Sequence, residues 1–406
     1  MAPPPAPPST PPVSPTGFRG IDELPLAHQR VLIRVDFDVP LDASGNVEND
    51  RKLRAALPTI RKAITEGARV VLATHLGEAL DKPVSLEPVA TKLAELLAQE
   101  VYLPDECVGD AARKVVSDLR EGQVCLLENL RFAGEEAKND EGFARKLAAL
   151  CDVYVGEAFG CSHLTQASLV ALPRMMKERG MGYRLRAELE ALSLGARPLQ
   201  RPCVGVLGGR SLTSKLDVFE IMLRRCDAIC VGGVVANTLL AAKSLDVKAS
   251  VFEAEQLALA RALLTRARDQ KVELLLPVDV LVAINGDAAE ARTVSVGSIP
   301  DQVGAFDLGP RSVEAITTRL RGAKTALVHG ALGFLENPVF ASSTTQVLTA
   351  LAEVPAHGIV TGASVTTAAL ASGIAEEKIG FISTGDVASL VLIEGKKLPG
   401  VEALRG

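Results

Sequence analysis

Two carboxylates follow the first strongly hydrophobic stretch of the chain. Residues 31–35 are rich in β-branched side chains, and Asp36 and Asp38 come directly after them, before Pro40. A buried strand that carries carboxylates to its carboxyl end is typical of active sites in open α/β sheets. The same pattern also fits a plain core strand whose acids are solvated, so this stretch alone leaves both interpretations open.

Three later strands in the first half of the chain are also followed by polar side chains. These predicted strands and the residues after them are 69–74 with His75, 123–128 with Arg131, and 152–155 with His163. The carboxyl ends of parallel strands lie at one edge of their sheet. We therefore expect these side chains to gather around Asp36 and Asp38.

Glycines follow four predicted strands in the second half of the chain. The strands and their glycines are 203–207 with Gly208 and Gly209, 227–231 with Gly232 and Gly233, 324–328 with Gly330, and 357–361 with Gly362. Bare backbone amides at the start of a helix can cradle phosphate, although single turns of this kind are also ordinary connections. Four together favour phosphate binding. A Walker A motif and a GxGxxG after a strand are both missing, which excludes a P-loop and a Rossmann dinucleotide site.

Around these residues, predicted strands and helices alternate along the chain. The alternation is interrupted near the middle of the chain and then resumes. The chain has 406 residues, 48% of them hydrophobic but only 3% aromatic, which suits two cores of aliphatic parallel strands covered by helices. We predict an α/β fold of two doubly wound parallel-sheet domains joined by a hinge. The predicted parts are a proline-rich disordered tail at 1–17, a first domain at 18–185, a hinge at 186–200 and a second domain at 201–389.

The net charge and the cysteines argue against two classes of protein, nucleic-acid-binding proteins and disulfide-rich secreted proteins. The net charge is −5 without a basic stripe, which argues against nucleic-acid binding. Seven scattered cysteines without a CxxC argue against a disulfide framework and indicate a reducing compartment. Cys226 and Cys230 lie four residues apart, but no further ligands accompany them, so we predict no metal site there.

Nothing in the sequence predicts a membrane protein. The longest uncharged runs, 228–242 and 358–375, are interrupted by Gly, Ser, Thr or Asn, and the N-terminus lacks the basic and apolar regions of a secretory signal. We expect a cytoplasmic protein, and a monomer. The tail at 1–17 reads as a solvated extension, with docking to an SH3-like partner as the alternative.

Several runs, in order along the chain, resemble the phosphoglycerate kinase family. They include RVDFDVP (34–40), THLG (74–77), LLENLRF (126–132), DVYVGEAFG (152–160), LLLPVDV (274–280), DLGPRS (307–312) and EGKKLPGV (394–401). The resemblance spans roughly residues 19–404. It implies that the first domain holds 3-phosphoglycerate, that the second holds ATP or ADP with Mg²⁺, and that the C-terminal tail, 390–406, returns to the first domain.

The resemblance also assigns roles to single residues. It implies substrate binding by Asp36, Asp38, Lys52, His75, Arg131 and His163, and nucleotide binding by Gly209, Lys215, Gly330, Glu336 and Gly362.

The chain departs from the family pattern at many of the positions that carry chemistry. Asp38 stands where the family has Asn, and Lys52 where it has Arg. Asp386 and Val387 interrupt a glycine run. The other substitutions are Glu78 and Leu164 for Arg, Ser211 for Lys, His329 for Asn, Ser364 for the Mg²⁺-coordinating Asp, and Val365 for Thr.

These departures predict weak or absent kinase activity. A charge-assisted hydrogen bond contributes about 1.5–3 kcal/mol, so losing the arginines at positions 78 and 164 removes about 3–6 kcal/mol of substrate affinity. Ser364 in place of a carboxylate counts against Mg²⁺ binding. Nearby groups offer compensation: Arg210 for the phosphates and Glu157 for Mg²⁺.

Three functions remain open from the sequence. The first is the family reaction, ATP + 3-phosphoglycerate ⇌ ADP + 1,3-bisphosphoglycerate. The second is a non-catalytic pseudoenzyme with a regulatory or binding role, and the third is a kinase for a less anionic acid.

Overall fold

The structure, a computed structural model, describes residues 17–77, 84–192, 199–354 and 357–405. The chain divides into two compact units. The N-terminal unit is Met1–Glu190 together with Lys396–Gly406, and the C-terminal unit is Ala191–Gly395. None of the helices in the described ranges combines the length and the apolar character that crossing a membrane requires.

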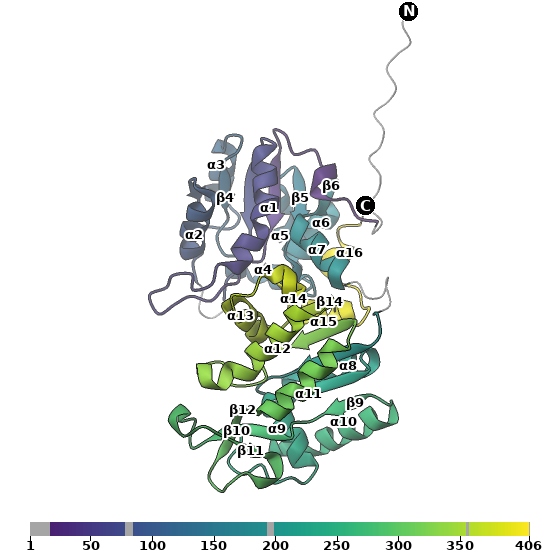
Figure 1. The fold of residues 1–406 in the computed structure, drawn as a ribbon. Helices are drawn as coiled ribbons and strands as arrows, with labels where there is room; N and C mark the ends of the chain where they lie inside the picture. Colours follow the sequence, from purple (N-terminus) through teal and green to yellow (C-terminus); the bar gives the residue numbers. More distant parts are fainter. Residues whose placement is uncertain (1–16, 78–83, 193–198, 355–356, 406) are drawn as a thin grey trace, which may run out of the picture. The chain divides into compact units, whose positions relative to one another are not determined.

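The N-terminal unit is built on one six-stranded parallel sheet with the order β3-β4-β2-β1-β5-β6 (Figure 1). Its strands are β1 (Arg30–Arg34), β2 (Arg69–Ala73), β3 (Val101–Tyr102), β4 (Val124–Leu126), β5 (Val153–Gly156) and β6 (Glu178–Met181). Its helices are α1 (Arg51–Thr65), α2 (Glu87–Leu97), α3 (Asp110–Asp118), α4 (Gly134–Ala137), α5 (Glu141–Ala148), α6 (Leu172–Met175), α7 (Tyr183–Leu192) and α16 (Pro399–Glu402).

The central strand β1 explains why this sheet forms. Val31, Leu32 and Ile33 are fully buried, so the strand is apolar on both faces, as helix-covered parallel sheets require. The chain passes from β1 to β2 on one side and later returns to β5 on the other. The loops after β1 and β5 therefore diverge, and ligands bind at such switch points in open α/β sheets.

The C-terminal unit repeats this plan with the order β15-β14-β13-β7-β8-β9. The parallel strands are β7 (Cys203–Leu207), β8 (Ala228–Val231), β9 (Glu273–Leu275), β13 (Thr325–His329), β14 (His357–Thr361) and β15 (Phe381–Ile382). The helices are α8 (Leu216–Arg225), α9 (Gly233–Ala242), α10 (Leu257–Asp269), α11 (Pro310–Arg321), α12 (Ser342–Glu353), α13 (Ala363–Ala371), α14 (Glu376–Ile379) and α15 (Val387–Ile393). Its switch point lies between β7 and β13.

The predicted fold class is confirmed: two doubly wound parallel α/β units. One addition was not predicted, a three-stranded antiparallel sheet of β10 (Asp279–Ala283), β11 (Arg292–Ser295) and β12 (Gly304–Leu308). The hinge at 186–200 stays a prediction; it overlaps α7 and extends outside the described residues.

Candidate functional site

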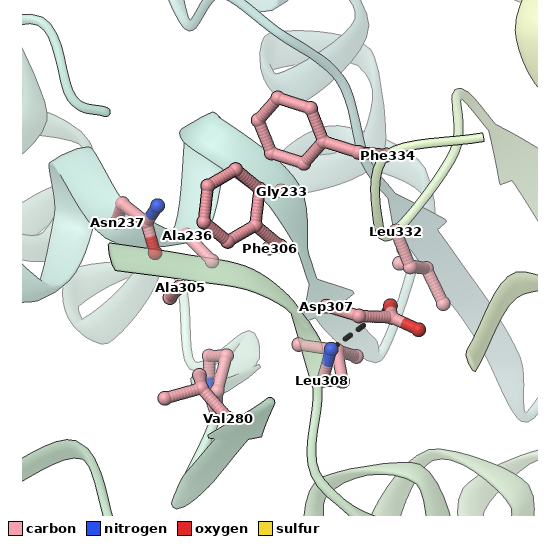
Figure 2. A pocket seen from close by; sticks show the side chains of 11 residues that line it. Gly233, Ala236, Asn237, Val280, Ala305, Phe306, Asp307, Leu308, Leu332 and Phe334 are labelled. Carbon is pink, nitrogen blue, oxygen red and sulfur yellow. Dashed lines mark hydrogen bonds between the residues drawn. The ribbon is translucent and has the colours of Figure 1, made fainter. Parts of the chain in front are cut away.

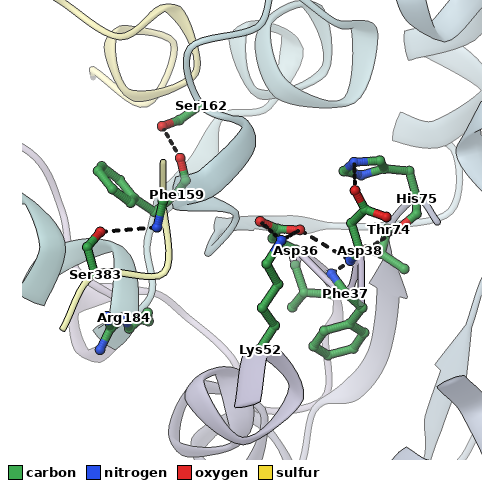
Figure 3. Close-up of polar contacts among 12 residues, drawn as sticks. Asp36, Phe37, Asp38, Lys52, Thr74, His75, Phe159, Ser162, Arg184 and Ser383 are labelled. Atoms are coloured by element: carbon green, nitrogen blue, oxygen red, sulfur yellow. Dashed lines mark hydrogen bonds and ion pairs between the residues drawn. The ribbon is translucent and has the colours of Figure 1, made fainter. Parts of the chain in front are cut away.

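The N-terminal site lies where β1 ends between β2 and β5. Arg34 pairs with Ala73 of β2 on one side and with Gly156 of β5 on the other. This register brings Asp36 and His75, each two residues beyond a strand end, to the same edge of the sheet. Lys52 reaches Asp36 from the first turn of α1, as Figure 3 shows.

Asp36 and Lys52 form a mostly buried ion pair. The Lys52 Nζ atom donates to both carboxylate oxygens of Asp36 at 3.0 Å, and the backbone N–H of Asp38 donates to Asp36 Oδ1 at 3.2 Å. Burial opposes the charged form of Asp36 most strongly, but the electrostatic interactions with Lys52 and His75 and the hydrogen bonds from Lys52 and the Asp38 backbone together outweigh it and hold the pKa of Asp36 below its usual range. Burial likewise opposes the charge of Lys52, and Asp36 outweighs it, so the pKa of Lys52 is raised. Both groups are therefore charged at neutral pH.

His75 is a neutral hydrogen-bond donor. Arg34 Nη2 lies 3.3 Å from His75 Nδ1, and because a guanidinium only donates, Nδ1 accepts. The ring proton then sits on Nε2, which lies 3.8 Å from Asp38 Oδ2. Burial, followed by the charge of Arg34, lowers the pKa of His75 to about 3.

A buried network holds Arg34 against His75. Arg34 Nε donates to Ser168 Oγ at 2.8 Å, and Ser168 Oγ donates to Glu136 Oε1 at 2.5 Å. Arg34 also donates to the backbone carbonyl of Val35. The guanidinium is fully buried, so these contacts fix its orientation.

The N-terminal site is suited to an anion. Arg34, Lys52 and Arg131 supply three cations, and the Arg131 Nη1 atom is buried with no hydrogen-bond partner among the described residues. A buried donor without a partner costs about 1–3 kcal/mol, which an incoming oxyanion would offset.

A metal fits this position less well. Donor atoms of Asp36, His75 and Cys161 lie within 4.8 Å of one another. However, burial raises the pKa of Cys161 to about 12, so its sulfur is a thiol, and Lys52 already binds both oxygens of Asp36. Cation ligands require deprotonated donors, so the arrangement favours an anion.

The other predicted residues of the first half are placed as follows. Asp38 accepts from the backbone N–H of Gly77 at 3.0 Å, and His163 is partly buried beyond the turn Phe159–Cys161. Leu164 packs against the apolar cluster of Ala158, Cys161, Leu169, Val170 and Ala403. Glu78 lies outside the described residues.

Glu157, the residue expected to compensate at Mg²⁺, has its carboxylate occupied by protein donors. Its carboxylate accepts from the backbone N–H groups of Arg184 and Leu185, each at 3.0 Å, and from the hydroxyl of Thr59. It therefore holds the start of α7, where orphan N–H groups need acceptors. Burial raises the pKa of Glu157 to about 7.

The C-terminal site forms where the loops after β7 and β13 touch. A Cβ atom added to Gly330 would lie 2.3 Å from the carbonyl oxygen of Gly208, so only glycine allows this approach. Gly330 also has a positive φ of 79°. The two loops thus place backbone at the switch point, as a phosphate cradle requires.

Lys215 and His329 form the polar centre of this site. Lys215 ends the 3-10 turn Thr213–Lys215 and directly precedes α8. Its Nζ atom lies 3.0 Å from His329 Nε2. An ammonium only donates, so Nε2 accepts and the ring proton sits on Nδ1, which has no hydrogen-bond partner among the described residues.

The His329 ring is neutral and closely enclosed. The ring is fully buried, and burial together with the charge of Lys215 lowers the pKa of His329 to about 4. A Cβ atom added to Gly362, which precedes α13, would lie 3.0 Å from His329 Cε1. Gly362 therefore makes room for the imidazole at this position.

The substituted positions of the second half have structural partners of their own. Ser211 Oγ donates to Glu253 Oε1 at 2.8 Å, which places a carboxylate beside the turn that carries Lys215. Ser364 Oγ accepts from the backbone N–H of Ala331 at 3.2 Å. Val365 is 1% exposed and belongs to the hydrophobic core.

A small pocket lies in the same unit, and we call it the Phe306 pocket (Figure 2). Two aromatic side chains, Phe306 and Phe334, lie edge to face at 5.2 Å. Asn237 and Asp307 are its polar lining residues, and burial raises the pKa of Asp307 to about 6. The other lining residues are Gly233, Ala236, Pro277, Val280, Ala305, Leu308 and Leu332.

Glu336 and Arg210 lie beside this pocket. Arg210 Nη1 is ion-paired with a carboxylate oxygen of Glu336, and its guanidinium lies 5.3 Å from the ring centre of Phe334. Both charged side chains are largely exposed. The cation expected to compensate at the phosphates is thus directed to Glu336 in this structure.

Comparisons with known proteins agree over almost the whole chain. The model of the family described as phosphoglycerate kinase matches residues 21–396. The phosphoglycerate kinase of Anaeromyxobacter sp. (strain Fw109-5) is 45% identical over 395 residues, which cover 96% of this chain and 100% of that protein. This chain belongs to the phosphoglycerate kinase family.

Other phosphoglycerate kinases match as extensively. The protein from Microcystis aeruginosa is 41% identical over 391 residues, covering 95% of this chain and 97% of its own. The crystal structure of phosphoglycerate kinase from Pyrococcus horikoshii superimposes with a TM-score of 0.86 at 31% identity, covering 96% of this chain and 98% of the other. The structure from Coxiella burnetii gives 0.82 at 32% identity, covering 95% and 98%.

The structure thus brings the predicted residues into groups within each unit. Asp36, Asp38, Lys52 and His75 lie together, and Lys215 lies against His329. The lining of the Phe306 pocket was missed, as were Glu253 and Asp386 as neighbours of the C-terminal site. The signal for the pocket was present: Phe306 and Phe334 are two of only 11 phenylalanines in a chain without tryptophan.

Proposed function

We propose that this chain catalyses the reaction of its family, phosphoryl transfer between ATP and 3-phosphoglycerate, at a reduced rate. The observation that carries the proposal is the N-terminal site, where Arg34, Lys52 and Arg131 all lie near His75 and the buried donor Arg131 Nη1 has no hydrogen-bond partner among the described residues. That arrangement fits an acid with several negative charges. The Nε2–H group of the neutral His75 ring adds one more hydrogen-bond donor for such an acid.

The C-terminal unit is proposed to hold the nucleotide. The Phe306 pocket has the aromatic and aliphatic lining typical of sites for a planar base. The glycine loops after β7 and β13 and the ammonium of Lys215 would hold the phosphates. The residues fit a nucleotide, and a bound Mg²⁺ would neutralise charge on its phosphates.

The reduced rate follows from what the substituted side chains do. Leu164 contributes an apolar contact where the family has a guanidinium, and Glu253 holds Ser211 where the family has an ammonium. Removing one donor that stabilises transition-state charge costs about a hundred- to a thousandfold in rate. Lys52 keeps a charge but lacks the two-pronged geometry of arginine.

Titration calorimetry with 3-phosphoglycerate, then separately with MgADP, followed by a coupled kinase assay, tests the proposal. We expect both ligands to bind, with turnover well below that of the Anaeromyxobacter relative assayed in parallel. Binding of neither ligand would end the enzyme hypothesis. Turnover equal to the relative's would refute the proposed cost of the substitutions.

A non-catalytic binding protein is the second candidate. The ion pair of Lys52 with Asp36 favours it, because the cation proposed to neutralise the transferring group already has a partner. Binding of both ligands without any turnover would establish this alternative. In either case we propose that the protein is a monomer and that its ligands are small molecules. The proline-rich segment 1–17 stays a predicted extension or docking segment, and almost all of it lies outside the described residues.

A further inference from the structure

The carboxylate of Asp386 lies at the C-terminal site, in addition to that of Glu253. Asp386 follows β15 and precedes α15, and its Oδ1 atom lies 3.6 Å from His329 Nε2. The preceding carbonyl, of Gly385, accepts from Thr361 Oγ1 at 2.9 Å. The loop is therefore tied to the end of β14, and Asp386 is held over His329, beside Lys215.

The Asp386 carboxylate approaches His329 without being hydrogen-bonded to it. His329 Nε2 accepts from Lys215, so it carries no proton to donate to Asp386. The side chain does not cap α15, and in the described part of the chain no hydrogen bond to this carboxylate is formed. Its side chain is 49% exposed, so its oxygens are available to a ligand.

The carboxylate also adjoins the proposed phosphate cradle. The position of a Cβ atom on Gly362 lies 3.2 Å from His329 Nε2, the same ring atom that Asp386 approaches. Ser364, in the first turn of α13, contributes no charge there. A carboxylate at this place repels phosphates, and a divalent cation between them would turn that repulsion into attraction.

We propose that Asp386 is the protein carboxylate that binds the divalent cation accompanying the nucleotide phosphates, in place of the acid missing at Ser364. The inference rests on the proposed function, since it assumes that nucleotide binds in this unit. Mg²⁺ is commonly held by one or two carboxylates together with substrate phosphates, and Asp386 offers one. Lys215, whose Nζ atom approaches the same His329 nitrogen as Asp386, would contact the phosphates beside the cation.

Calorimetric titration of ADP, once in EDTA and once in excess Mg²⁺, tests this assignment through opposite changes in affinity. In Asp386→Asn, ADP should bind more tightly than in the natural protein when metal is absent, because a repelling charge is gone. MgADP should bind more weakly. The ratio of the two affinities should fall by about tenfold or more, the scale on which metal sites respond to altered ligands.

Glu377→Gln is the matched control, because it removes one exposed carboxylate of the same unit, on α14. It should leave the ratio unchanged. Asp386→Asn with Ser364→Asp should recover the metal dependence. Electron paramagnetic resonance of Mn²⁺ with ADP gives a direct readout, since the bound Mn²⁺ signal should weaken in Asp386→Asn and return in the double variant.

The outcomes separate the two proposals. A natural protein that binds no ADP in either condition overturns the proposed function and this inference with it. A natural protein that binds ADP, with the same Mg²⁺ dependence in Asp386→Asn, overturns only the assignment of Asp386.

Discussion

Replacing Lys52 by methionine should destabilise the N-terminal unit, and the loss should depend on pH. Methionine keeps the length of the side chain but leaves Asp36, a buried carboxylate, without its cation. Removing one partner of a fully buried ion pair costs about 3–5 kcal/mol. The Lys52 side chain is 29% exposed, so solvent screening reduces this, and we expect about 2–3 kcal/mol at pH 7.

The loss should shrink as the pH falls. In the natural protein the pKa of Asp36 is lowered by folding, so its contribution is present above the unfolded pKa, about 3.9, and is lost in stronger acid. In Lys52→Met, burial without the cation raises the pKa of Asp36. Protonation then relieves the buried charge, and the variant should approach the natural protein between pH 7 and about pH 4.

Tyrosine fluorescence during urea unfolding measures this effect in one unit alone. The chain has three tyrosines, Tyr102, Tyr154 and Tyr183, all in the N-terminal unit, and no tryptophan. Lys62→Met, on the same helix, is the control, because its partners Glu66 and Asp22 are exposed carboxylates and such surface pairs contribute about 0–1 kcal/mol each. The reasoning is refuted if Lys52→Met loses no more stability than this control, or if its deficit does not shrink in acid.

Three further predictions follow from the site. Leu164→Arg should strengthen 3-phosphoglycerate binding by about 1.5–3 kcal/mol in calorimetry; an unchanged affinity would place this side chain away from the ligand. ¹⁵N NMR at pH 6 should show His75 protonated on Nε2 and His329 on Nδ1, both neutral because their pKa values are about 3 and about 4; matching tautomers would contradict the assigned donors. Glu157 has a folded pKa raised to about 7, so the folded state keeps its proton where the unfolded state has lost it, and stability should fall as pH rises from about 4 to about 7. Glu157→Gln should flatten that fall in urea titrations, and an unaltered pH profile would assign it to another group.

Local patterns were enough to predict most of the scaffold. The hydrophobic runs at 31–35 and 203–207 predicted β1 and β7, and the glycines after the second run predicted the loop that meets β13. Such features depend on neighbouring residues, so one sequence carries them. The strand β11 was missed because it is mostly exposed and lacks the continuous apolar run of a parallel strand.

The site was harder to predict because its contacts join distant residues. Glu157 has the right residue type for a metal ligand, yet its carboxylate holds the start of α7, a use visible only when the fold is known. The tautomers of His75 and His329 depend on Arg34 and Lys215, which are far away in the sequence. The type of a residue indicates which chemistry it could perform, but residues distant in the sequence determine its hydrogen bonds and its protonation.

The N-terminal unit is discontinuous, because Lys396–Gly406 belongs to it while the intervening residues form the other unit. The backbone N–H of Gly400 donates to the carbonyl of Ser162 at 2.9 Å, and Ala403 packs in the cluster with Leu164. During synthesis, the first unit therefore waits for its last segment while residues 191–395 are translated, roughly 10–40 s at the usual rate. Nascent chains of this protein should accordingly expose an unfinished apolar surface next to the N-terminal site until residues 396–406 have emerged from the ribosome.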